Sequence, residues 1–296
     1  MDIVAALVRH HLLLVETATR RDLDDPATAR YVADLVGTEP VLDLLHTLTE
    51  ADALATGPTA WSPWRAQLVA DLVTRVRAVL GGQAVAPVPA LLDEHRDLLD
   101  TTELEVRLAP DETGWTVTVA APDRRGLMAS VTGVLALHRL SVRAATLHTE
   151  GGVAVDRWSV VPAYGDPPEL DRLRTDLRAA LDGTLDVAKL LARREASGGR
   201  DRTSTGQGVL QRVRVDVVEG ASLTATVLEV RAPDRPALLH RLGRVLTLAG
   251  VDVRAARVAT LGGDAVDVFY VVDEPGGPLS DSRAREVARV LRDAAG

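Results

Sequence analysis

The sequence predicts an α+β protein in which an all-helical N-terminal region is followed by two copies of a βαββα unit. Two observations support this: a long internal repeat, and a change from helical spacing of apolar residues to the alternation typical of strands. The segment VAAPDRRGLMASVTGVLALHRLSVRAATLHTEGGVAVDRW begins at Val119, and VRAPDRPALLHRLGRVLTLAGVDVRAARVATLGGDAVDVF begins at Val230. They align without a gap at an offset of 111 residues, from Asp123 to Asp234. Roughly half of the aligned positions are identical, which establishes a duplication.

The first copy shows the elements of the unit in order. Alternation predicts a strand over 116–121, and helical spacing predicts a helix over 127–137, for which Asp123 is the expected N-cap. Two strands joined at the hairpin of Gly151 and Gly152 follow, and then a polar helix over 168–181. The second copy is expected to place its elements at 227–232, 238–249, 251–260, 265–272 and 280–294, and one more short strand is expected before each copy, at 103–108 and 212–218. This order implies an antiparallel sheet with helices on one face.

The N-terminal region carries helical spacing only. Helices are expected at 3–17, 27–36, 40–55 and 63–80. Glycine and proline between 81 and 89, and a stretch rich in Gly, Ser, Thr and Arg near 200, mark linkers. The predicted organisation is a helical region over 1–82, a linker and helix over 83–102, a first repeat domain over 103–196, a flexible linker over 197–208 and a second repeat domain over 209–296.

Composition excludes several classes of function. The formal net charge of −8 argues against nucleic acid as a partner, because phosphate binding needs a clustered basic face. The chain has no cysteine, so disulfides, thiolate metal sites and a cysteine nucleophile are excluded. No apolar run approaches the roughly 20 residues of a membrane helix, and no signal peptide is recognisable, so a cytoplasmic protein without membrane contact is expected.

At the motif A-P-D-R-x-G-L the repeats resemble the ACT family, whose ferredoxin-like βαββα domains bind small effectors, often amino acids. The matching residues are Asp123, Arg124, Gly126 and Leu127 in the first copy and Asp234, Arg235, Ala237 and Leu238 in the second. A glycine lets the backbone approach a ligand closely, and free amides at a helix N-terminus attract a carboxylate. The alternative is that Asp123 only caps a helix and Gly126 only makes a turn. Because Pro236 and Ala237 replace Arg125 and Gly126, the effector is expected at the first copy rather than the second.

The N-terminal phrases resemble a second, more specific family. L-V-R-H-H-L-L-L, A-x-R-R-D-L-D-D-P and L-T-E-A-D-A-L-A-T-G-P followed by W-x-x-W are similar to the end of the HD domain of the bifunctional PII uridylyltransferase/uridylyl-removing enzymes. That family runs nucleotidyltransferase domain, HD domain and two ACT domains. The resemblance implies that this chain is its regulatory, glutamine-sensing portion, acting in nitrogen regulation with PII signalling proteins as partner. It also implies glutamine or another small amino acid as ligand, pairing of ACT domains into a homo-oligomer, and a divalent metal such as Mg²⁺ in the intact enzyme. Transfer of UMP or of AMP stays open.

The catalytic motifs of that family are absent from this sequence. It contains neither the Gly-Ser motif with paired aspartates of the transferase nor a His-Asp doublet. His10, His11 and Asp52 match part of the HD metal site, but they supply too few ligands for a firm divalent site. We therefore expect no catalytic residue and no tightly bound metal in this chain. The alternative function is a stand-alone amino-acid-binding ACT module with no catalytic partner.

Overall fold

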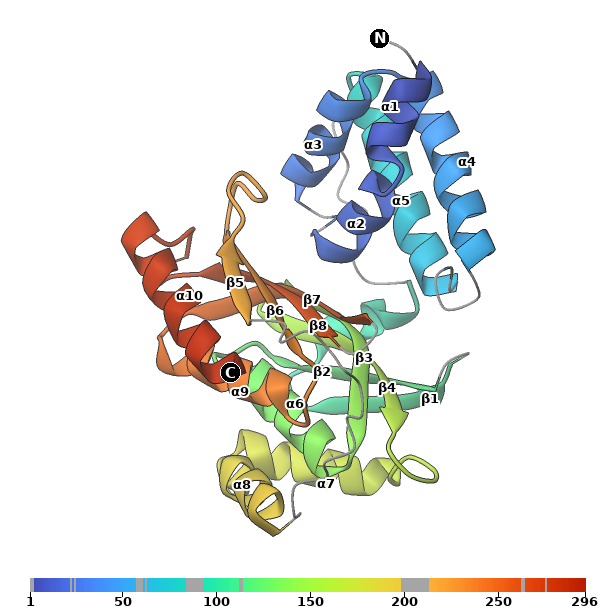
Figure 1. Ribbon diagram of the computed structural model, residues 1–296. Helices are drawn as coiled ribbons and strands as arrows, with labels where there is room; N and C mark the ends of the chain where they lie inside the picture. Colours follow the sequence, from blue (N-terminus) through green and yellow to red (C-terminus); the bar gives the residue numbers. More distant parts are fainter. Residues whose placement is uncertain are drawn as a thin grey trace. The chain divides into compact units, whose positions relative to one another are not determined.

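The computed structural model describes residues 3–21, 23, 25–56, 61, 63–83, 93–111, 114–197, 213–261, 264–274 and 276–296. The chain divides into two compact units. One comprises Met1–Ala90 with Glu219–Leu223, and the other comprises Leu91–Val218 with Thr224–Gly296 (Figure 1). Below they are called the helical unit and the sheet unit.

The helical unit is built from five described helices that share one core. Leu14, Val32, Leu42, Leu45 and Leu72 are buried at its centre. The helices are α1 (Ile3–His10), α2 (Leu13–Arg20), α3 (Pro26–Val36), α4 (Glu39–Thr56) and α5 (Pro63–Leu80).

The ends of these helices follow local chemistry. Asp25 caps α3, accepting a hydrogen bond from the amide of Ala27 at 2.8 Å, with Pro26 at the first helical position. The single helix predicted over 3–17 is wrong, because the chain breaks between α1 and α2. There the His11 ring donates from Nδ1 to the Val8 carbonyl at 2.9 Å, taking an acceptor that a continuing helix would use. The helices predicted over 27–36, 40–55 and 63–80 are confirmed to within a residue or two.

The sheet unit contains one antiparallel sheet of eight strands in the order β1-β2-β4-β3-β7-β8-β6-β5. Each repeat supplies four strands, and the repeats join where β3 pairs with β7. In that pairing Thr146 lies opposite Arg257, and these two residues occupy equivalent positions of the duplication. The repeats are therefore related by a local two-fold axis through this pair. The strands are β1 (Glu105–Pro110), β2 (Trp115–Pro122), β3 (Leu140–Glu150), β4 (Val153–Pro162), β5 (Arg214–Val217), β6 (Thr226–Pro233), β7 (Asp252–Leu261) and β8 (Asp264–Val272).

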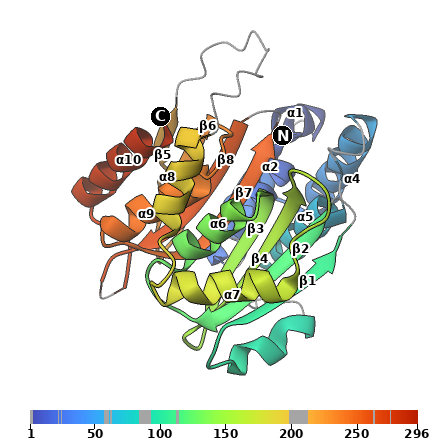
Figure 2. The same cartoon turned by 90° about the horizontal axis from the view of Figure 1, so that it is seen from below.

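Helices cover one face of this sheet (Figure 2). They are α6 (Leu127–Leu137), α7 (Leu170–Leu181), α8 (Val187–Ser197), α9 (Leu238–Leu248) and α10 (Asp281–Ala295), and the 3₁₀ helix η1 (Asp93–Asp100) contacts β4. One hydrophobic core runs under both repeats, with Trp158 and its equivalent Phe269 fully buried in it. At the centre α6 packs on α9, where a Cβ added to Gly243 would lie 3.1 Å from the Ala129 Cα. The two repeats thus form a single folded body.

The α+β class, the N-terminal helical region and the duplicated unit are confirmed by this architecture. The extra strand expected before each copy is also present, as β1 and β5. Asp123 as N-cap of α6 is wrong: the helix begins after Gly126, and no side chain caps it. Helix α8 was not predicted. Of the linker and helix predicted over 83–102, residues 84–92 lie outside the described residues, and a 3₁₀ helix, η1, is present at 93–100. The linker predicted over 197–208 lies outside the described residues except for residue 197.

Candidate functional site

Each repeat presents the same turn between a strand and a helix. We call Asp123–Leu127 the first turn and Asp234–Leu238 the second turn. Gly126 has φ of +88° and Ala237 has φ of +60°, so both adopt the left-handed conformation immediately before the helix. The backbone bonds match too, since Leu127 N donates to Arg124 O, and Leu238 N to Arg235 O, both at 3.1 Å. The β-carbon of Ala237 therefore does not change the turn, although it adds left-handed strain of about 1 kcal/mol.

The local two-fold axis places each turn against the other repeat. The first turn faces the end of α9 and the start of β7, whereas the second turn faces the end of α6 and the start of β3. We call the resulting clefts the first site and the second site. The first site is lined by the first turn with Asp156, Thr247, Val251 and Asp252, and the second site by the second turn with Asp267, His240, Arg139, Leu140 and Ser141. All residues matched to the ACT effector turn thus line one of two equivalent clefts between the repeats.

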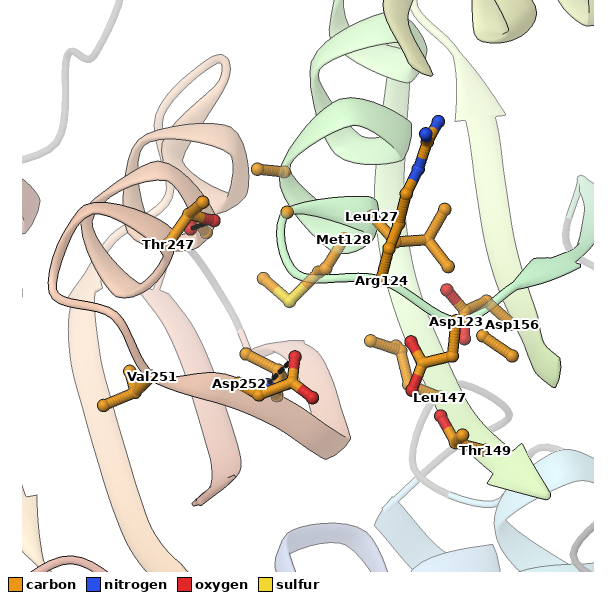
Figure 3. Close-up of a pocket in the computed structure, with 15 residues that line it drawn as sticks. Asp123, Arg124, Leu127, Met128, Leu147, Thr149, Asp156, Thr247, Val251 and Asp252 are labelled. Atoms are coloured by element: carbon orange, nitrogen blue, oxygen red, sulfur yellow. Dashed lines mark hydrogen bonds between the residues drawn. The ribbon is translucent and has the colours of Figure 1, made fainter. Parts of the chain in front are cut away.

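The first site is almost closed. Its cavity is about 20 Å³, enough for roughly one water molecule. Figure 3 shows the Met128 side chain between the two repeats, Asp252 facing Asp123 across the cleft, and Arg124 turned away from both carboxyl groups. The first turn packs on α9, because a Cβ added to Gly126 would lie 3.3 Å from the Thr247 Cγ2.

The second site is open and much larger. Its cavity is about 770 Å³, within the range of small-molecule sites. Leu191, Arg194 and Glu195 of α8 form one wall. In the described part of the second repeat, no helix after α10 corresponds to α8.

A carboxyl group at the same strand position is buried in each site. Asp156 on β4 is 3% exposed and Asp267 on β8 is 0% exposed. Burial raises the pKa of Asp156 well above its ordinary value, Asp123 raises it further, and the backbone amide of His148 opposes the shift. Burial likewise raises the pKa of Asp267 well above its ordinary value, and nearby Asp234 adds to the shift. Both carboxyl groups therefore keep their protons to higher pH than an exposed aspartate does.

The pKa values of the carboxyl groups of the two turns, Asp123 and Asp234, are shifted in the same direction. Burial raises the pKa of Asp123, as does Asp252, while the Thr149 side chain and the Arg124 amide bond to its charged form and oppose the change. Burial also raises the pKa of Asp234, and the positive charge of Arg143 opposes it. Each site thus holds a turn carboxyl close to a fully buried one.

His240 forms a hydrogen bond between the two repeats beside the second site. Its Nδ1 donates to the Ala129 carbonyl at 2.7 Å, and the ring is buried. Burial lowers the pKa of His240, the Ala129 bond opposes this, and Arg244 and Arg241 lower it further. The neutral ring is therefore the favoured form.

Asp156, Asp267 and His240 were not among the predicted site residues. A signal for the two aspartates was present, since an acidic residue recurs in the apolar strand motif A-V-D of both copies. No such signal existed for His240, because Ala129 occupies its position in the first copy.

The predicted partial metal site receives no geometric support. His11 is exposed and bonded to the Val8 carbonyl of the preceding helix, Asp52 is exposed on α4, and His10 is the last residue of α1. Among the residues described, no group of three or more His, Cys, Asp or Glu could hold a metal ion. These residues do not fit a divalent metal, and their role stays a prediction. None of the described helices is long and apolar enough to cross a membrane.

Comparison with known proteins agrees with this architecture. A family model described as the ACT domain matches residues 226–289, within the second repeat. A bifunctional uridylyltransferase/uridylyl-removing enzyme of Streptomyces coelicolor is 47% identical over 98% of this chain and 40% of its own length. Proteins of the same name from Mycobacterium tuberculosis and Gluconobacter oxydans are 37% and 32% identical, over 90% and 95% of this chain. An aspartate kinase structure from Synechocystis aligns over 61% of this chain with a TM-score of 0.32 and 18% identity.

The chain spans 34–40% of the length of these three relatives. The match extends through the helical unit as well as both repeats, since it covers at least 90% of this chain in each case. The chain is thus homologous, over nearly its whole length, to the part of the bifunctional uridylyltransferase/uridylyl-removing enzymes that carries the ACT domain.

Proposed function

We propose that this chain is the effector-sensing regulatory portion of a nucleotidyltransferase/nucleotidyl-removing enzyme that acts on PII signalling proteins, and that glutamine is the effector. The observation that carries the proposal is the pair of clefts between the repeats, each holding an effector-type turn and a buried carboxyl group. The similarity to the uridylyltransferase/uridylyl-removing enzymes suggests which catalytic activity the effector would regulate. The same role implies a cytoplasmic location, and a divalent metal in catalytic domains outside this chain.

A ligand between two repeats can act as a signal because it contacts both. If it binds one arrangement of the repeats more tightly, it shifts the population toward that arrangement. The change can reach neighbouring domains only to the extent of that difference in affinity. Pairing of β3 with β7 and of α6 with α9 provides the surface on which such a change would occur.

Thermal unfolding of the purified chain with and without glutamine tests the proposal. A ligand at about 100 times its Kd stabilises the folded state by about 2.7 kcal/mol, which raises the melting temperature by several degrees. Glutamine is expected to raise it, and D-glutamine, as the matched control, is expected to have little effect. An unchanged melting temperature at millimolar glutamine, in protein shown to be folded, would contradict the proposal.

The alternative, a free-standing amino-acid-binding module without catalysis, makes a different prediction about activity. In the proposed role, glutamine changes the rates at which an enzyme containing this chain adds and removes the nucleotidyl group of PII protein. Those rates, measured with UMP and AMP donors, distinguish the two functions. Glutamine binding without any effect on either rate would favour the alternative.

A further inference from the structure

The two clefts are equivalent by duplication but differ in chemistry. The second cavity, at about 770 Å³, is far larger than the first, at about 20 Å³. Two differences between equivalent positions contribute to this difference in volume. Thr247 at the first site corresponds to Ala136 at the second, and Asp252 corresponds to Ser141. The smaller side chains open the second cleft and remove one of its acidic groups.

The buried carboxyl groups also differ in their partners. Asp156 accepts a hydrogen bond from the backbone amide of His148. At Asp267 both carboxyl oxygens are buried and form no hydrogen bond with any residue that the structure describes. A buried polar group left unpaired is destabilising, so a ligand that pairs with it would recover that free energy on binding.

His240 also lines this cavity. Its Nε2 is buried and forms no hydrogen bond with any described residue, while its Nδ1 donates to the Ala129 carbonyl. With Nδ1 donating, a neutral His240 ring offers Nε2 as an acceptor. His240 Nε2 and the ionised form of Asp267 would therefore both accept hydrogen bonds from a bound molecule.

The remaining charges of the second site are of both signs. Asp234 lies close enough to Asp267 to raise its pKa, and His240 is the other titratable group on the wall nearest the second turn. The other charged groups lining the cavity are Arg139, Arg194, Glu195 and Arg235. An acidic interior with arginines among its lining residues fits a molecule that carries an ammonium group and a carboxylate.

We propose that the effector, an α-amino acid, occupies only the second site, where its ammonium group donates to the Asp267 carboxylate and to His240 Nε2. This inference rests on the proposed function. It places the ligand at the second turn, whereas the glycine of the first turn predicted the ligand there. Binding carries a proton balance: the ammonium group keeps its proton, the Asp267 carboxyl group loses its own, and that proton passes to the solvent buffer. Up to one proton is therefore released per molecule bound, at pH values below the raised pKa of Asp267.

Titration calorimetry of the full chain with glutamine near pH 6 tests this. The binding enthalpy is measured in phosphate and in imidazole, which both buffer near pH 6 and differ strongly in ionisation enthalpy, so its dependence on buffer gives the number of protons released. The expected result is one glutamine per chain and release approaching one proton. Glutamine lacking the α-amino group, 5-amino-5-oxopentanoic acid, is expected to bind at least 10-fold more weakly and to release no proton.

The duplication provides a matched pair of variants. Asp267→Asn is expected to weaken glutamine binding at least 10-fold and to abolish proton release, whereas Asp156→Asn, the equivalent change at the first site, leaves both within about 2-fold. The opposite pattern, two glutamines per chain, or binding without proton release overturns the inference and leaves the proposed function standing. No binding by the folded wild-type chain overturns both. If Asp267→Asn does not fold, the wild-type proton count and the comparison with the analogue still decide.

Discussion

At the scale of single residues, the two buried carboxyl groups are the most unusual chemistry in the sheet unit. Asp156 and Asp267 lie on the helix-covered face of the sheet, each buried in a mostly apolar core beside the carboxyl group of its turn. Removing a charge from water costs free energy, so burial raises the pKa of each group and disfavours its ionised form. The stability of the protein therefore depends on pH in a direction opposite to that expected for paired surface carboxylates.

The direction of this pH dependence follows from the linkage between proton binding and folding. Because the folded pKa of Asp267 is raised, both states carry the proton below the ordinary carboxyl range, and its stabilising effect is fully present there. As pH rises from that range toward the folded pKa, the unfolded chain loses the proton first. Stability then falls by up to about 1.4 kcal/mol per pH unit for each such group.

We therefore expect Asp267→Asn, which cannot titrate, to gain stability relative to the wild type as pH rises from 4 to 7. Urea unfolding at a series of pH values measures this difference. Asp166→Asn, at an exposed position, serves as control. A wild-type-minus-variant difference that stays flat across the series would show that Asp267 is already ionised in the folded state.

The turn residues were predicted as site residues from the sequence, whereas the buried aspartates were not. Asp123 and Asp234 were found because the A-P-D-R motif is contiguous and repeated. Asp267 was missed as a site residue because its role depends on β8 lying between β6 and β7, with its side chain under the second turn. The unequal size of the two clefts depends on α8, on Ala136 and on Ser141, which lie far from the second turn in sequence.

At the scale of elements, close packing of helices at glycines joins the repeats. A Cβ added to Gly133 on α6 would lie 2.5 Å from the His240 Nδ1 and 2.5 Å from the Val187 Cγ1. No real side chain tolerates such contacts, so α6, α8 and α9 can meet there only while residue 133 is glycine.

Gly133→Ala is accordingly expected to destabilise the sheet unit by about 1–3 kcal/mol through overpacking, despite the gain of about 1 kcal/mol in helix propensity. Ser130→Ala on the same helix is the matched control and should stay within about 0.5 kcal/mol of the wild type. Urea unfolding measures both, and the His240 ring resonances should shift only in the first variant. Equal stability of the two variants would mean that the helices can separate at little cost.

Element boundaries within each repeat were predictable because local periodicity and the duplication reinforced each other. Strands β2, β4, β6 and β8 and helices α6 and α9 appear within a few residues of expectation. The pairing of β3 with β7 was not predictable in detail, since any free edge strand can accept a partner from the same chain or from another. Whether further copies of the chain also associate, as expected from the ACT resemblance, stays a prediction.

At the scale of the whole molecule, the sheet unit should unfold as one cooperative body. Its hydrophobic core is continuous across both repeats, and its eight strands form a single sheet. Opening one repeat alone would expose the α6–α9 contact and the edges of β3 and β7, so partial unfolding is unfavourable. The helical unit, by contrast, has a core of its own.

Native-state hydrogen exchange in increasing denaturant tests this cooperativity. Amides of β2 and β4 should converge on the same opening free energy as those of β6 and β8, while amides of α4 and α5 converge on a separate one. Saturating glutamine should raise protection in both repeats together, because a ligand in a cleft between them stabilises the shared body rather than the repeat whose turn it touches. Different opening free energies for the two repeats, or protection confined to one, would mean that they are independent domains. In that case a ligand bound at the second turn would not change the stability of the first repeat. The first repeat is the one that follows the main part of the helical unit in the sequence.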